Sequence, residues 1–167
     1  MVPLESFVIP NPIMLRLEEM VEKNCCLVKV GCYKSIRIGV GEVVEIKNPR
    51  FTAFHGAWEI GAYNAAWRVI QNGKIVCGSS DPIDQIQELQ VVLDGLKFGL
   101  FRAITPLSAF DFRIVFNNET TIDILCTFQN SDEIIHIFFP DGWVASYAYR
   151  VGWDIELGRK PWFDRTE

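Results

Sequence analysis

The sequence predicts an α+β fold in which two similar halves pack as one domain. Apolar residues recur at helical spacing in two segments, and short apolar runs typical of β-strands follow each segment. These elements return in the same order in the second half of the chain. Asn24 and Gly95, which both suit the end of a helix, stand at matching places just before a strand-like run. We therefore interpret the chain as an internal duplication of one helix followed by several antiparallel strands.

The predicted boundaries follow from this repeat. The chain is expected to form a single domain over residues 1–167, because this length suffices to bury about 70% of the surface of the unfolded chain. The two halves span residues 13–80 and 83–150, an extended N-terminal arm spans residues 1–12, and a C-terminal tail spans residues 151–167.

The composition is that of a soluble globular protein, with 49% hydrophobic and 22% charged residues. The longest apolar runs are far shorter than the roughly 20 residues that span a bilayer. The N-terminus lacks the basic and apolar regions of a secretory signal. We therefore expect a cytoplasmic protein without a membrane segment.

The five cysteines and the net charge argue against several kinds of site. The cysteine count is odd and includes no C-x-x-C pair, so the sequence indicates reduced thiols instead of a disulfide framework or a zinc site. The formal net charge is -5, and the lysine and arginine residues are scattered, so binding to nucleic acid is not expected. We expect neither a metal nor a cofactor.

Two helices are predicted. Prolines keep residues 1–12 extended, and the first helix then runs from Pro12 to Lys23, with apolar residues on one stripe. The second helix begins at Asp81, a candidate N-cap, followed by Pro82 at the first helical position, and it ends at Gly95.

Turn residues predict the hairpins. Asn72-Gly73 is the strongest signal, because both residues tolerate a positive φ between two apolar strands. Pro140-Asp141-Gly142 is its counterpart in the second half. Asn117-Asn118 predicts a third hairpin, with Gly41-Glu42 as the matching turn in the first half. The stretch 47–65 is the main departure from symmetry.

That unrepeated stretch concentrates aromatic residues, a histidine and a carboxylate. Loops of this kind often carry function, and His55 with Glu59 is a candidate acid and base pair. The alternative, which we favour, is that Trp58 is a core anchor and His55 a surface residue. His136, the second histidine, is expected on the solvated face of a strand. With two histidines and no Ser-centred or phosphate-binding motif, the sequence favours no enzymatic activity.

Residues 58–150 contain a series of turn features, in the order Trp67-Arg68, Asn72-Gly73, Gly78-Ser79-Ser80-Asp81, Asp94-Gly95 and Pro140-Asp141-Gly142. This turn chemistry resembles that of small uncharacterised bacterial proteins grouped with polymorphic-toxin immunity proteins. The resemblance implies a non-enzymatic, acidic, cytosolic protein that binds a toxin domain. It assigns no functional residue, because these groups share no catalytic motif.

The leading hypothesis is therefore a protein-binding module, such as an immunity-type inhibitor of a bacterial toxin. Aromatic residues of the unrepeated stretch and of the tail are the candidate partner-binding residues, since such side chains anchor interfaces: Phe54, His55, Trp58, Trp153 and Trp162.

Two alternatives stay open. The first is a small-molecule-binding or enzymatic domain with a pocket between the halves, lined by His55, Glu59, Tyr63 and Arg68. The second is a structural subunit of a homo-oligomer, for which a homodimer is the simplest form. For the tail, docking on its own domain competes with partner binding.

Overall fold

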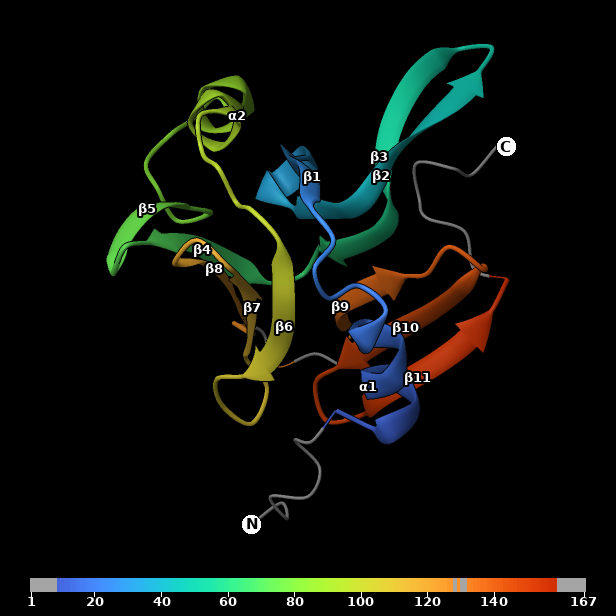
Figure 1. The fold of residues 1–167 in the computed structure, drawn as a ribbon. Helices are drawn as coiled ribbons and strands as arrows, with labels where there is room; N and C mark the ends of the chain where they lie inside the picture. The colour runs from blue at the N-terminus through green and yellow to red at the C-terminus, as the bar shows by residue number, and fades with distance from the viewer. Residues whose placement is uncertain (1–8, 128, 130–131, 159–167) are drawn as a thin grey trace.

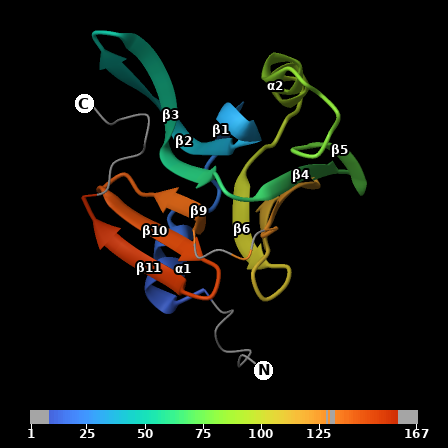
Figure 2. The ribbon, with the colours of Figure 1, turned by 180° about the vertical axis from the view of Figure 1, so that it is seen from behind.

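Two antiparallel sheets make up most of the chain in a computed structural model, which describes residues 9–127, 129 and 132–158. One sheet has six strands in the order β1-β2-β3-β9-β10-β11, and the other has five in the order β5-β4-β8-β7-β6. The sheets lie side by side and face a common interior (Figures 1 and 2).

The bounds of the elements are as follows. The six-stranded sheet contains β1 (Cys25–Val30), β2 (Ile36–Asn48), β3 (Phe51–Ala62), β9 (Glu133–Phe138), β10 (Trp143–Ala148) and β11 (Gly152–Leu157). The five-stranded sheet contains β4 (Ala66–Gln71), β5 (Lys74–Gly78), β6 (Phe101–Pro106), β7 (Phe112–Phe116) and β8 (Thr120–Leu125). The helical elements are α1 (Asn11–Glu18), α2 (Ile86–Asp94) and the short 3-10 helix η2 (Cys32–Lys34).

The predicted fold class, α+β with two helix-plus-strand halves, is wrong. Strands make up 53% of the described residues and helices 14%, so the fold is β-rich. The two predicted halves also fail as separate units, because each sheet takes strands from both. β3 pairs with β9, and β4 pairs with β8. Turn signals act between neighbours in the sequence and carry no information on these long-range pairings.

The core lies between the two sheets and follows from the period-two alternation of their strands. β7 shows it most simply, since Phe112, Ile114 and Phe116 are buried while Arg113 and Val115 are half-buried on the opposite face. The same alternation brings apolar residues of both sheets into one cluster, including Ile38, Ile60, Ile137, Val69, Ile122 and Ile124.

Both helices are shorter than predicted. α1 ends at Glu18 instead of Lys23, because the chain beyond it closes in turns in which Met20 and Val21 donate to carbonyls three residues earlier. α2 begins at Ile86 instead of Asp81. The Asp81 carboxylate accepts a hydrogen bond from the N–H of Gly78 (3.0 Å), so it ends β5 instead of capping the helix.

Three of the four predicted hairpin turns are confirmed. Asn72 and Gly73 both have positive φ (51° and 73°), as a primed two-residue turn between β4 and β5 requires. Gly142 (φ 87°) lies in the turn between β9 and β10, and residues 117–119 join β7 to β8. The fourth, at Gly41-Glu42, is wrong, because β2 continues through these residues as one strand with a bulge.

As a result, β2 and β3 form a hairpin much longer than its neighbours. β1 pairs with β2 only as far as Val40, and β9 pairs with β3 only from Glu59 onward. Residues 43–56 therefore extend beyond the sheet as a two-stranded ribbon (Figure 1). We call this segment the projecting hairpin. It includes most of the unrepeated stretch, which is strand and not the predicted loop.

The N-terminal arm and the tail are only partly described. Asn11 and Pro12, expected in the extended arm, belong to α1, and residues 152–157 of the tail form β11. Residues 1–8 and 159–167 lie outside the described residues. None of the helices in the described part of the chain is long and apolar enough to cross a membrane.

Candidate functional site

The projecting hairpin has two distinct faces, which the pairing of β2 with β3 defines. Residues directly opposite each other in an antiparallel pair point to the same face. Glu45 pairs with Phe54 and Lys47 with Thr52, so these four share one face with Val43. Val44 pairs with His55 and Ile46 with Ala53, which places those four on the opposite face.

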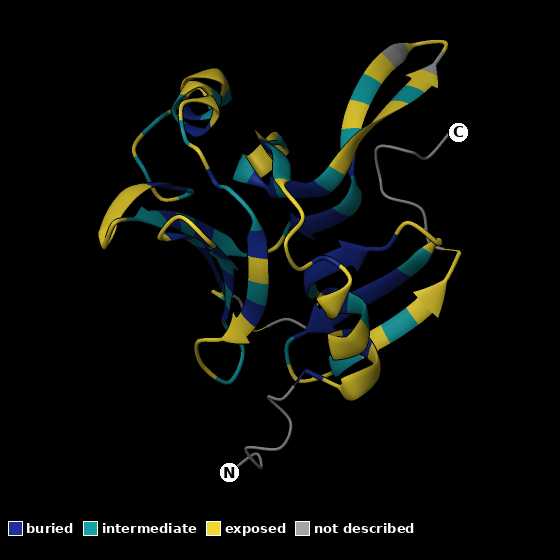
Figure 3. Cartoon of the chain, viewed as in Figure 1, coloured by how far each residue is buried: buried dark blue, intermediate teal, exposed yellow. Residues whose placement is uncertain are grey.

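The first of these faces is open to solvent. Val43 is 54% exposed and Phe54 is 50% exposed, and the two lie on the same face of the ribbon. Glu45, Lys47 and Thr52 are exposed around them. Figure 3 shows exposed and intermediate colours along the hairpin, with buried residues only near its root. We call Val43, Phe54 and the three polar residues the apolar face of the hairpin.

Glycines determine how the hairpin leaves the sheet. A Cβ at Gly56 would lie 2.5 Å from the backbone nitrogen of Val40, and a Cβ at Gly39 would lie 2.8 Å from the nitrogen of Gly56. Only glycine permits two backbones to approach so closely. Gly41 adopts a positive φ (90°) in the bulge, and its N–H donates to the carbonyl of Asn24 (2.8 Å).

Trp58, a predicted partner-binding residue, lies at the root of the hairpin instead of on its exposed part. Its half-buried ring covers Gly41, where a Cβ would lie 2.9 Å from the ring, and the Lys23 ammonium is 5.3 Å from the ring centroid. Its indole N–H has no hydrogen-bond partner among the described residues. Trp58 thus supports the direction of the hairpin.

His55 and Glu59, the predicted acid and base pair, both bond the backbone of Gly56. His55 Nδ1 lies 2.7 Å from the carbonyl oxygen of Gly56, and the N–H of Gly56 donates to Glu59 Oε2 (3.1 Å). Both side chains therefore fix the backbone at the root of the hairpin. This arrangement differs from that of a catalytic pair, in which the two side chains bond each other.

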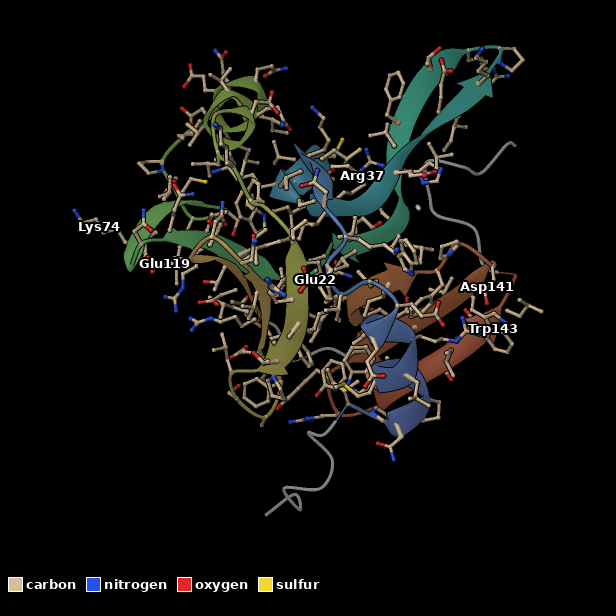
Figure 4. All side chains as sticks on the ribbon, in the orientation of Figure 1. Glu22, Arg37, Lys74, Glu119, Asp141 and Trp143 are labelled. Carbon is tan, nitrogen blue, oxygen red and sulfur yellow. The ribbon has the colours of Figure 1, made fainter. Side chains whose placement is uncertain are left out.

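Glu59 is nonetheless an unusual carboxylate. It is 1% exposed, and its nearest cation is Arg37, with 3.4 Å between Nη1 and Oε1. Burial raises the pKa of Glu59 to about 7, although the Arg37 charge and the Gly56 N–H both act to lower it. Arg37 is labelled at the root of the hairpin in Figure 4.

More polar groups lie beside Glu59 on the outer face of the six-stranded sheet, which is the face away from the core. His136 is 5% exposed, so the expected solvated histidine is wrong, and its Nε2 lies 2.6 Å from Glu133 Oε2. The Tyr63 ring is 5.2 Å from the His136 ring, and its hydroxyl lies over Gly61, 2.6 Å from where a Cβ would be. We call Arg37, Glu59, Tyr63, Glu133 and His136 the polar cluster.

Arg68, the fourth residue of the predicted pocket, is on the other sheet. It donates to Asp123 (2.9 Å), which also accepts two hydrogen bonds from Arg113 (2.7 and 3.0 Å). The Asp123 side chain is fully buried; burial alone would raise its pKa, but hydrogen bonds from Arg113 and Arg68 outweigh this and lower it. His55, Glu59, Tyr63 and Arg68 therefore do not line one pocket.

The two predicted partner-binding residues of the tail, Trp153 and Trp162, do not join the projecting hairpin in one described surface. Trp153 lies in β11, and its half-buried ring packs against the core, with its centroid 5.4 Å from the ring centroids of both Phe112 and Tyr147. Trp162 lies outside the described residues. Of the five predicted partner-binding residues, Phe54 is the one that the structure places on an exposed apolar surface.

A hollow of about 510 Å³ lies between the start of β1 and the end of α2. Cys25, Cys26, Asp94, Lys97 and Asn118 are among its lining residues. Burial raises the pKa of Cys25 to about 12, so its thiol is a poor nucleophile. Within the described part of the chain, no group of three His, Cys, Asp or Glu side chains could hold a metal ion.

Comparison with known proteins adds no relative. No family model, no curated protein and no solved structure matches the chain. The functional argument therefore depends on the geometry of the projecting hairpin and the polar cluster.

Sequence reasoning missed several residues of these two sites. The turn predicted at Gly41-Glu42 makes Val43 part of an ordinary hairpin strand, and nothing in the sequence singles out Arg37 or Glu133. One signal was present: residues 43–57 contain apolar side chains but no run of alternation that would bury one face completely. Such a pattern fits a ribbon that is exposed on both sides.

Proposed function

We propose that this protein is a non-enzymatic module that binds another protein through the apolar face of the projecting hairpin. The observation that carries the proposal is the exposure of Val43 and Phe54 on a ribbon that extends beyond its own sheet. Exposed apolar residues held on a rigid element are typical of interaction sites. Here the close approach of the Gly39 and Gly56 backbones, which we call the glycine crossing, and the Gly56 hydrogen bonds hold the ribbon in a fixed direction.

The surroundings of these two residues also suit an interface. Stable protein interfaces combine an apolar or aromatic centre with a polar rim. Phe54 supplies the aromatic centre, while Glu45, Lys47 and Thr52 supply a rim that contains both signs of charge. The partner is therefore expected to present an apolar pocket of its own with polar edges, instead of a uniformly charged surface.

A bacterial toxin domain is the class of partner that we propose, as the immunity-type resemblance implies. The acidic balance of the chain, with a net charge of -5, agrees with such a role. We also propose a cytoplasmic location. All five cysteines carry free thiols, and burial raises the pKa of Cys77 to about 11, as suits a structural thiol in a reducing compartment.

Binding experiments with single alanine variants test the proposal. Phe54→Ala should weaken partner binding by about thirtyfold or more, the usual effect of truncating an interface anchor. Val91→Ala is the matched control, because Val91 is an exposed apolar residue (71%) on α2, away from the hairpin. Both variants should melt close to the wild type. The comparison is made by affinity capture from the native cells, followed by titration of the captured partner.

Two outcomes would contradict the proposal. One is a partner that both variants retain equally, which would place the interface elsewhere. The other is a partner that both variants lose equally, which would indicate a nonspecific effect of removing surface apolar area. Only a loss confined to Phe54→Ala supports the hairpin as the interface.

A second candidate function, the binding of a small molecule, is favoured by one observation. The polar cluster brings a carboxylate with a raised pKa close to a histidine, a tyrosine and an arginine on one sheet face. The test is a thermal-shift screen of small carboxylates, phosphates and amines. A compound that stabilises the wild type but not Glu59→Gln would support this function over the first.

A further inference from the structure

Bonds to other groups close parts of several strand edges in the described part of the chain, as natural sheets require to limit pairing with other chains. The edge of β1 is closed by the Gln90 side chain, whose amide accepts from the N–H of Val30 and donates to the carbonyl of Val28 (both 2.9 Å). At the edge of β6, the N–H of Phe101 donates to the carbonyl of Lys23 (2.8 Å). At the edge of β5, the N–H of Gly78 is bonded to Asp81, and along residues 74–77 the exposed charge of Lys74 limits pairing.

Charge protects a further edge. β11 carries two exposed acidic residues, Asp154 and Glu156, so two copies of this edge would repel each other. On the projecting hairpin, β3 is closed near its root, where Gly56 is bonded to His55 and Glu59.

The outer edge of β2 in the projecting hairpin is different. The last bond on this side is the one from Gly41 to Asn24, and beyond it no hydrogen bond closes the edge in the described part of the chain. In an antiparallel strand, every second residue directs its N–H and C=O away from the paired strand. β2 therefore offers backbone groups along residues 43–47 that no described residue pairs.

We propose that this edge pairs with the same edge of a second copy, so that two projecting hairpins form a four-stranded antiparallel ribbon. Such a contact is isologous, because an antiparallel pairing of identical strands has a two-fold axis. The axis passes beside Ile46, which then lies opposite Ile46 of the second copy.

The charges of β2 select this register. With Ile46 on the axis, Glu45 lies opposite Lys47 of the second copy, and Lys47 lies opposite its Glu45. Both cross-strand pairs are of opposite charge, and each stabilises the pairing by a modest amount. Moving the axis by one residue, to Glu45, would instead oppose two identical carboxylates. Within one chain, Lys47 Nζ and Glu45 Oε2 lie 3.7 Å apart in an exposed ion pair. Because this pair is exposed, both side chains can exchange it for the pairs with the second copy.

The same register also joins the apolar residues of the other face. Ala53 lies beside Ile46 in each hairpin, so the ribbon gains an apolar row of Ala53, Ile46, Ile46 and Ala53 across the axis. Because only the hairpins take part, the buried area falls below the roughly 1,200 Å² of standard interfaces, and the dimer is expected to be weak.

This inference goes beyond the proposed function and does not depend on it. Pairing uses the backbone edge of β2 and the charges of Glu45 and Lys47, whereas partner binding is anchored by the side chains of Val43 and Phe54, with Glu45 and Lys47 only at its rim. The two copies would present two Phe54 side chains on one ribbon, which allows bivalent binding of a partner that is itself oligomeric.

Sedimentation measurements over a range of concentrations test the pairing. The wild type should show a mass that rises toward twice that of the monomer. Glu45→Lys and Lys47→Glu each place like charges opposite each other twice, so each should weaken the dimer about tenfold. The double variant Glu45→Lys/Lys47→Glu restores opposite charges and should dimerise nearly as the wild type does. Glu19→Lys, an exposed change on another element, is the control for net charge.

Each outcome of this experiment decides the proposal. Weakening in both single variants with recovery in the double variant supports the register. A wild type that stays monomeric at all concentrations overturns the proposal. A dimer that the single variants do not weaken, or that the double variant fails to restore, places the contact elsewhere and also overturns it. Circular dichroism of each variant confirms that the fold is intact.

Discussion

Glu59 lies in an unusual environment for a carboxylate. It is almost fully buried, yet within the described part of the chain one arginine and one peptide N–H compensate its charge. Burial affects the pKa of Glu59 more than the Arg37 charge and the Gly56 N–H do together, so this pKa rises to about 7. The ionised form is therefore a cost to the folded protein at neutral pH, which is typical of groups kept for a role other than stability. Here that role is to hold Gly56 at the root of the projecting hairpin.

The stability of the protein should depend on pH through Glu59. The pKa is raised from 4.5 to about 7 on folding, so the carboxyl is protonated in both states below pH 4.5. Between these values the unfolded chain ionises first, and the free energy of unfolding falls as pH rises. Glu59→Gln removes this titration. Relative to wild type, the variant should gain up to about 3 kcal/mol between pH 4.5 and pH 8.

Urea unfolding of both proteins across this pH range is the measurement. The wild type at each pH is the reference, so that other titrating groups cancel in the difference. A difference between the two proteins that stays constant with pH would show that Glu59 titrates at its ordinary value. The burial argument for its raised pKa would then be wrong.

At the level of elements, the projecting hairpin is the feature that sequence reasoning described least well. The turn at Asn72-Gly73 could be predicted because its conformation depends only on the two residues themselves. Gly41-Glu42 carries a similar local signal but forms a bulge, since the pairing of β2 with β3 on both sides of it decides the outcome. Local signals therefore predicted tight turns correctly and misjudged the length of one strand.

Because the Gly39 and Gly56 backbones approach closely at the root of the hairpin, one added methyl group at Gly56 should lower the free energy of unfolding markedly. Gly56→Ala places a Cβ 2.5 Å from the backbone nitrogen of Val40, where no flexible side chain can move away. The variant should be destabilised by about 1–3 kcal/mol, as overpacking usually is. Gly95→Ala is the control, because its Cβ would have 3.5 Å to the nearest atom and the glycine has a negative φ (-78°).

Thermal or urea unfolding of the two variants checks this prediction. If Gly56→Ala is as stable as Gly95→Ala, the two backbones are able to separate at little cost. The direction of the hairpin would then not be fixed by the crossing, and the rigid presentation of Phe54 would lose its physical basis.

At the scale of the whole molecule, two sheets share the strands of both predicted halves. The order of helices and strands was largely predictable, because periodicity and turn residues report on neighbours in the sequence. The β-rich architecture was not, because pairings such as β3 with β9 join segments far apart in the chain. The same limit applies to the site. Phe54 could be singled out as an aromatic residue, but its exposure depends on where β1 and β9 stop pairing.

The central claim is that the apolar face of the projecting hairpin contacts a protein partner, and site-specific photocrosslinking tests it most directly. A photoreactive benzoylphenylalanine is placed at position 54 in one sample and at position 91, on α2, in the other. Both sites are exposed and apolar, so they differ chiefly in their location. Irradiation in the native cells should give a covalent adduct with a different protein from position 54 and none from position 91. Adducts from neither position, or the same adducts from both, would contradict the claim.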